Sequence, residues 1–183
     1  MVIRKNILDK LYSKIKESQE PIELIGKAGV GKTILISQLL PHFFENDLEL
    51  SFIKIKAKND MLPFEIISKY CRKHFTYLPK ALLKSEPKNR DENLRISLEL
   101  ISSISYINKK LVFLVIDDFH ILSTEEQENF KLLANSKISD INLKLLLIGR
   151  PGWENNYAIE LKPFNKKEFN EFIKNNDPQT YKN

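Results

Sequence analysis

The arrangement of apolar and polar positions along the chain predicts its strands and helices. Continuous apolar runs at 22–25, 111–116 and 143–148 are typical of strands that are buried on both faces of a parallel sheet. Residues 50–57, where lysines alternate with apolar side chains, predict another strand, and a fifth short strand is expected at 157–161. Apolar residues recur at helical spacing in five segments, which are 4–17, 32–40, 63–75, 91–107 and 165–175.

Prolines and capping residues mark the expected ends of the helices. Pro41 is expected to close the second helix, because a proline in a helix interior removes a hydrogen bond. Ser123 or Thr124 caps a further helix, and Glu126 follows Ser123 at capping-box spacing. The stretches expected to be irregular are 76–90 and 176–183.

The order of strands and helices defines the fold class. Alternating strands and helices predict an α/β fold, a three-layer sandwich around a parallel five-stranded sheet. Binding sites in such sheets lie at the carboxyl ends of the strands. Three strands end there in Gly26, in Asp117-Asp118 and in Gly149-Arg150. The sequence therefore predicts one site at this edge.

The first of these strands runs into a phosphate-binding loop. Residues 26–33, GKAGVGKT, match G-x-x-x-x-G-K-[ST] in full, between an apolar strand and a helix. Backbone N–H groups and the helix N-terminus bind phosphates, Lys32 reaches the outer phosphates, and the Thr33 hydroxyl ligates Mg²⁺. The residues expected to contact the nucleotide are Gly26, Lys27, Ala28, Gly29, Val30, Gly31, Lys32, Thr33 and Ile34.

Two aspartates follow the most apolar strand. A carboxylate at the end of a buried strand needs a cation or a hydrogen bond, and Mg²⁺ held by Thr33 is the expected partner of Asp117. Asp118 is placed to polarise an attacking water. The alternative is that the pair caps a turn or the helix near Thr124.

Three further residues extend the candidate site. Arg150, after the strand at 143–148, is expected to contact the γ-phosphate, or else to pair with a surface carboxylate. His120 either tunes the site or is structural. Trp153 is expected to pack under a loop rather than on a base.

Composition and charge narrow the class of protein. The 183 residues suit about one domain, and the single cysteine, Cys71, excludes an intrachain disulfide. No zinc-ligand spacing, signal peptide or spanning segment is apparent, so the expected location is the cytoplasm and no membrane partner is expected.

The net charge is +5, and residues 54–90 carry ten basic and three acidic residues. This basic segment predicts either weak, non-specific DNA binding or a solvated surface.

Taken together, these motifs resemble the nucleotide-binding domain of AAA+-related P-loop ATPases, in particular the STAND signal-transducing ATPases and the origin-recognition ATPases. The stretches that carry the likeness are the opening segment 2–11, the Walker A loop 26–33, the Walker B strand 115–120, the sensor-1 strand 145–150 and the junction 159–173 that leads into a helical lid. The opening segment departs from its family pattern, with Ile3 in place of a glycine.

The resemblance implies further details. The sheet order would be 5-1-4-3-2, and adenine would pack near Val2 and Ile3. Residues 1–163 would form the nucleotide-binding domain, and 164–183 would begin a lid of which most is missing. Hydrolysis of ATP by this chain alone is therefore expected to be slow.

Three functions remain open at this point. The first is a Mg²⁺-dependent ATPase that acts as a STAND-like switch in signalling or defence, binds ATP and ADP, and self-associates on binding ATP. The second is a DNA-handling AAA+ ATPase, such as a loader or a transposition-type regulator. The third is a scaffold that binds ATP without hydrolysing it. A small-molecule kinase is less consistent with the sequence, because no arginine-rich lid is evident.

Overall fold

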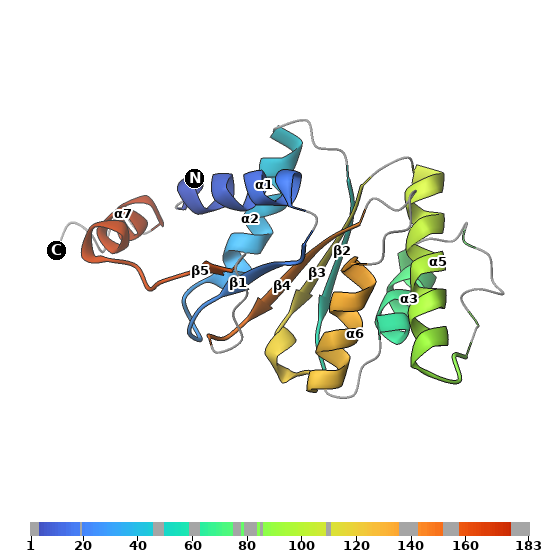
Figure 1. Ribbon diagram of the computed structural model, residues 1–183. Coiled ribbons are helices and arrows are strands. Elements are labelled where there is room, and N and C mark those ends of the chain that lie inside the picture. Colours follow the sequence, from blue (N-terminus) through green and yellow to red (C-terminus); the bar gives the residue numbers. More distant parts are fainter. Residues whose placement is uncertain are drawn as a thin grey trace.

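The chain folds as alternating strands and helices (Figure 1). The computed structural model describes residues 4–18, 20–45, 50–58, 63–74, 78, 84, 86–108, 111–135, 143–151 and 158–176. The elements are, in chain order, α1 Lys5–Glu17, β1 Ile22–Ile25, α2 Lys32–Glu45, β2 Leu50–Lys56, α3 Pro63–His74, α5 Arg90–Asn108, β3 Leu111–Asp117, the short 3-10 helix η1 Phe119–Ile121, α6 Thr124–Asn135, β4 Leu143–Gly149, β5 Ile159–Glu160 and α7 Lys166–Asn176.

The five strands form one parallel sheet in the order β2-β3-β4-β1-β5. Read from the other edge this order is 5-1-4-3-2, so the prediction of a parallel five-stranded sheet in that order is confirmed. Strand β3 lies between β2 and β4, and β4 lies beside β1. The carboxyl ends of β1, β3 and β4 therefore meet at one edge of the sheet.

Two helical layers cover the sheet, with α1 and α2 on one face and α3, α5 and α6 on the other (Figure 1). Along β3, Phe113 and Val115 pack in the core beneath α1 and α2, whereas Val112, Leu114 and Ile116 pack in the core beneath the other helices. Because both faces of β3 are buried, the residues that point to either face are apolar, and this explains the continuous apolar run in the sequence.

Helix α2 is longer than the sequence predicts. The expected end at Pro41 is wrong, because the helix continues through this proline to Glu45. The preceding turns are anchored by Leu35, Ile36 and Leu39, which are buried against the sheet. Their burial compensates for the hydrogen bond that a proline in a helix interior removes.

Apart from the fifth strand, the other element boundaries agree with the expectations to within one residue wherever both are given. The capping box of α6 is confirmed, since the Ser123 amide donates to Glu126 Oε2 (2.8 Å) and the Glu126 amide donates to Ser123 Oγ (3.3 Å). The fifth strand is shorter than expected, and Tyr157 lies outside the described residues, as do most of 76–90 and all of 177–183. Among the described residues, no helix is both long and apolar enough to span a membrane.

Candidate nucleotide-binding site

The phosphate-binding loop connects β1 to α2 directly, as its sequence context predicts. Gly29 and Gly31 have φ angles of 78° and 91°, in the left-handed region that glycine enters without steric cost. These two glycines turn the loop so that the N-terminus of α2 faces the carboxyl edge of the sheet. A helix N-terminus presents unpaired N–H groups to an anion.

Gly26 is needed for a different reason. A Cβ atom at this position would lie 2.5 Å from the backbone oxygen of Leu161. The Leu161 amide donates a hydrogen bond of 2.7 Å to the oxygen of Ile25. The segment that follows β5 therefore passes against the start of the phosphate-binding loop, and only glycine leaves room for it.

The Lys32 side chain lies along the loop. Its Nζ donates to the backbone oxygens of Gly26 (2.6 Å) and Lys27 (2.9 Å). Burial lowers the pKa of the Lys32 ammonium, while the carboxylates of Asp117 and Asp118 oppose that shift. The ammonium is thus held in the loop by backbone carbonyls. Phosphate oxygens are stronger hydrogen-bond acceptors than these neutral carbonyls, so a bound phosphate would attract the ammonium away from them.

Thr33 and Asp117 meet as the sequence predicts. Thr33 Oγ1 donates to Asp117 Oδ2 over 3.3 Å, and the backbone amide of Asp118 donates to Asp117 Oδ1 over 3.0 Å. A hydroxyl and a carboxylate are oxygen ligands of the kind that Mg²⁺ takes. Across the described residues no group of three or more His, Cys, Asp or Glu side chains could hold a metal. These two residues therefore fit a Mg²⁺ ion that takes its remaining ligands from water and phosphate. Thr33 would ligate the ion directly, and Asp117 would bind one of its water ligands.

Asp118 lies at the mouth of the site and has a left-handed backbone conformation. Its φ is 58°, and its Oδ2 forms an ion pair of 3.2 Å with Lys56 Nζ at the end of β2. The register of β2 on β3 places Lys56 opposite Asp117 and so beside Asp118. Neither aspartate caps α6, because Ser123 and Glu126 do so. The sequence reasoning missed Lys56, which only the strand pairing reveals.

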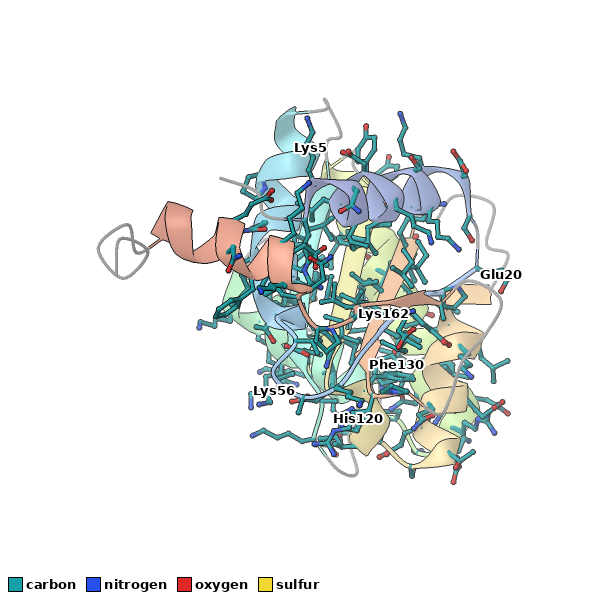
Figure 2. All side chains as sticks on the ribbon, turned by 90° about the vertical axis from the view of Figure 1, so that its left-hand side faces the viewer. Lys5, Glu20, Lys56, His120, Phe130 and Lys162 are labelled. Carbon is teal, nitrogen blue, oxygen red and sulfur yellow. The ribbon has the colours of Figure 1, made fainter. Side chains whose placement is uncertain are left out.

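A cavity of about 360 Å³ joins these residues. Its lining is Ala28, Gly29, Gly31, Lys32, Thr33, Ile34, Asp117, Asp118, His120 and Arg150. His120 packs against Gly149, and burial and the charge of Arg150 lower the pKa of its imidazole. Figure 2 shows Lys56 and His120 along the same lower edge of the molecule. Arg150 is exposed and lines the cavity, whereas Val2, Ile3 and Trp153 lie outside the described residues.

A second cavity of about 560 Å³ lies on the other side of the loop. It is lined by Arg4, Lys27, Ala28, Gly29, Val30, Gly31, Ile34, Leu35, Gln38, Pro163, Phe164 and Phe169. Of these residues, the sequence predicts Lys27, Val30 and Ile34 as part of the site, but it does not single out Arg4, Gln38 or the residues after β5. The motifs 2–11 and 159–173 contain most of these residues, but nothing in either motif indicated which side chains face the loop.

Comparison with known proteins identifies the family. A sequence profile of the AAA domain matches residues 15–156, and the chain belongs to this family. No curated protein sequence matches the chain.

Similar solved structures include Cdc6p from Pyrobaculum aerophilum, with 19% identity and a TM-score of 0.68, covering 93% of this chain and 48% of that protein. The ORC2 protein of Aeropyrum pernix, in ADPNP and ADP complexes, has 12% identity and a TM-score of 0.65, with coverages of 95% and 51%. The ORC1 protein of Aeropyrum pernix in complex with DNA has 13% identity and a TM-score of 0.62, with coverages of 96% and 49%.

The structural similarity, with TM-scores of 0.62 to 0.68, shows that the chain shares the P-loop α/β fold of these proteins, and the chain spans about half of their length. The expected AAA+ class is confirmed, whereas neither the family match nor these structures supports the STAND subtype.

Proposed function

We propose that this domain binds ATP with Mg²⁺ and hydrolyses it, as the nucleotide-driven module of a DNA-handling AAA+ ATPase. The observation that carries the proposal is the contact between Thr33 and Asp117, because it joins the phosphate-binding loop to the acidic strand end in one site. The two domain boundaries belong to the same proposal, with nucleotide binding in 1–163 and the start of a lid in 164–183.

Each residue has a chemical task in this proposal. Loop amides and Lys32 would bind the outer phosphates, and Thr33 and Asp117 would hold Mg²⁺, which neutralises the charge that develops on the phosphates. Asp118 would orient and polarise the attacking water. Arg150, which reaches the same cavity, would bind the γ-phosphate by charge-assisted hydrogen bonds.

DNA handling is favoured over the STAND-like switch by two lines of support. One similar structure, ORC1 of Aeropyrum pernix, is a complex with DNA. In addition, the Lys and Arg residues of 54–90 that the structure describes are largely exposed, and only Lys54 among them is half-buried. The exposed ones are Lys56, Lys58, Lys69, Arg72, Lys73, Lys84, Lys88 and Arg90. The switch remains the second candidate because His120 and Arg150, both part of the STAND-like motifs, line the cavity.

Nucleotide binding is tested by comparing wild type with Lys32→Ala in thermal unfolding with and without MgATP. A ligand that binds only the folded state raises the melting temperature, so wild type is expected to shift and Lys32→Ala is not. Lys10→Ala, on the exposed face of α1, removes the same charge outside both cavities and should shift like wild type. An equal shift in Lys32→Ala contradicts the site.

DNA handling is tested by measuring ATP turnover with and without random-sequence duplex DNA. We expect slow turnover that the duplex stimulates. Turnover that ignores DNA, together with oligomers that form only with ATP in light scattering, favours the switch instead. Binding of ATP without any turnover in either condition favours the scaffold.

A further inference from the structure

His120 lies in the short helix η1, directly after the acidic end of β3, and the backbone on either side of it is fixed. The Ile121 amide donates a hydrogen bond of 3.0 Å to the oxygen of Asp118. Phe119 is fully buried and packs edge-on against Phe130 of α6, with the ring centroids 6.0 Å apart. With Phe119 anchored in the core, the His120 side chain is held at the phosphate cavity that it lines.

The two ring nitrogens of His120 have different surroundings. Nδ1 faces the end of β4, where a Cβ atom on Gly149 would lie 3.9 Å from it. This nitrogen is buried, and it has no hydrogen-bond partner among the residues that the structure describes. Nε2 lies further out along the ring and is not buried in this way, so it is the nitrogen that a ligand in the cavity can reach.

Phosphate oxygens accept hydrogen bonds, so the ring can bind them only through an N–H group. Burial lowers the pKa of the His120 imidazole, and the charge of Arg150 lowers it further against the opposing effect of nearby carboxylates, which favours the neutral ring. A neutral imidazole carries one N–H group. On Nδ1 that group would be buried without an acceptor, whereas on Nε2 it can be donated to a phosphate oxygen.

His120 lies at the end of the phosphate cavity that is farther from the second cavity. The loop residues that line both cavities, and so mark their junction, are Ala28, Gly29, Gly31 and Ile34. His120 and Arg150 line the phosphate cavity alone. In a nucleotide whose nucleoside occupies the second cavity, the phosphate nearest to His120 would therefore be the terminal one.

We propose that His120 donates a hydrogen bond from Nε2 to the terminal phosphate of a bound nucleoside triphosphate, and so makes the site prefer a triphosphate to a diphosphate. The inference rests on the proposed nucleotide function and adds a second donor for the phosphate that Arg150 would bind. Arg150 is an exposed, long side chain, whereas His120 follows a buried anchor and offers one donor from a fixed position.

The test is calorimetric titration of wild type, His120→Asn and His120→Gln with MgADP and with MgADPNP, a triphosphate that resists hydrolysis. Asparagine is too short to place a donor where Nε2 lies, whereas glutamine carries its amide nitrogen close to that point. His120→Asn is expected to weaken MgADPNP binding about 10-fold or more, the scale of one hydrogen bond to a charged acceptor. MgADP binding should stay near the wild-type value, which also shows that the variant is folded. His120→Gln should retain most of the affinity for MgADPNP.

The possible failures are distinguishable. If wild type binds neither nucleotide, the proposed function itself is wrong. If wild type binds both and His120→Asn weakens both equally or neither, the assignment of His120 is overturned. Equal losses of MgADPNP affinity in His120→Asn and His120→Gln exclude a donor at the Nε2 position.

An indirect effect through Arg150 is separated by repeating the titration in the Arg150→Met background. If His120 binds the phosphate itself, His120→Asn still lowers the affinity for MgADPNP relative to MgADP when Arg150 is absent. If His120→Asn changes nothing in this background, His120 only positions Arg150, and the proposal is overturned.

The position of the ring proton gives an independent measurement. Nuclear magnetic resonance of the nitrogen-labelled chain with MgADPNP reports which ring nitrogen carries a proton, and the His120 signal is the one that disappears in His120→Gln. A proton on Nε2 is expected. An Nε2 without a proton in the complex would contradict the hydrogen bond.

Discussion

At the scale of single residues, the site depends on two carboxylates that adjoin in sequence and differ in environment. Asp117 is almost fully buried and accepts hydrogen bonds from the Thr33 hydroxyl and from the backbone amide of Asp118. Asp118 is partly exposed and its carboxylate pairs with Lys56. A buried carboxylate that accepts two hydrogen bonds is fixed in position, as a residue beside a metal ion needs to be. A partly exposed carboxylate at the cavity mouth can reach a water, and the two proposed roles follow from this difference.

Asp118→Asn should separate hydrolysis from binding. Asparagine tolerates the left-handed backbone at this position better than most residues, so the fold is expected to survive. The variant loses the charge that polarises water, and we expect turnover to fall roughly 100-fold or more while MgATP binding is retained. Steady-state turnover and calorimetric titration measure the two effects.

The matched control is Lys56→Met, which removes the ion-pair partner of Asp118 and leaves the carboxylate in place. Exposed ion pairs contribute little to stability, so this variant should fold like wild type and still hydrolyse ATP. If Asp118→Asn turns over as fast as wild type, Asp118 has a structural role only.

At the scale of elements, the segment after β5 that leads into α7 lies against the junction of β1 and the phosphate-binding loop. Leu161 hydrogen-bonds to Ile25 and its oxygen lies where a side chain on Gly26 would project. A few residues further on, Phe164 contacts Arg4. The backbone that leads into α7 thus lies directly against the start of the loop at 26–33.

Gly26→Ala should therefore destabilise the domain. The new methyl group would meet a backbone oxygen, which cannot rotate away as a side chain can, and overpacking of this kind costs about 1–3 kcal/mol. The free energy of unfolding from urea denaturation measures the effect. Gly149→Ala is the control, because a Cβ there would lie 3.6 Å from its nearest neighbour and should be tolerated. Equal losses in the two variants would exclude the close approach of Leu161 as the cause.

At the scale of the whole molecule, exposed basic residues lie on both sides of the sheet, and those of the basic segment 54–90 include a pair on α3. Lys69 and Lys73 are exposed on α3, and Figure 1 shows α3 on the face opposite to α1. This surface lies apart from the phosphate-binding loop, so a bound polyanion would leave that loop accessible.

We expect DNA binding through this surface to be weak and independent of base sequence, because no DNA-reading motif is present. Fluorescence anisotropy with a random duplex should show binding at low salt that is lost at about 200 mM. Lys69→Glu combined with Lys73→Glu should abolish it. The same reversal at Lys5 and Lys10, exposed on α1, should retain most of it, and equal losses in both pairs would contradict an interface on α3.

The sequence alone was sufficient for features that depend on neighbouring residues. The buried strand at 111–116, the phosphate-binding loop at 26–33 and the capping box of Ser123 and Glu126 were all predicted correctly. Each is decided by local periodicity, by glycine conformation or by hydrogen bonds within one turn. The five stretches that resemble AAA+-related ATPases also identified the AAA+ class, but the STAND subtype that they suggested is not supported by the comparisons.

Tertiary structure decided whatever joins distant parts of the chain. Pro41 stays within a helix because burial of the preceding turns outweighs the local penalty. Lys56 meets Asp118 only through the register of β2 on β3, and Arg4 meets Phe164 only because β5 lies beside β1. Sequence periodicity indicates which face of an element is buried, whereas the residue that lies opposite depends on how the strands pair and how the segments between them return to the sheet.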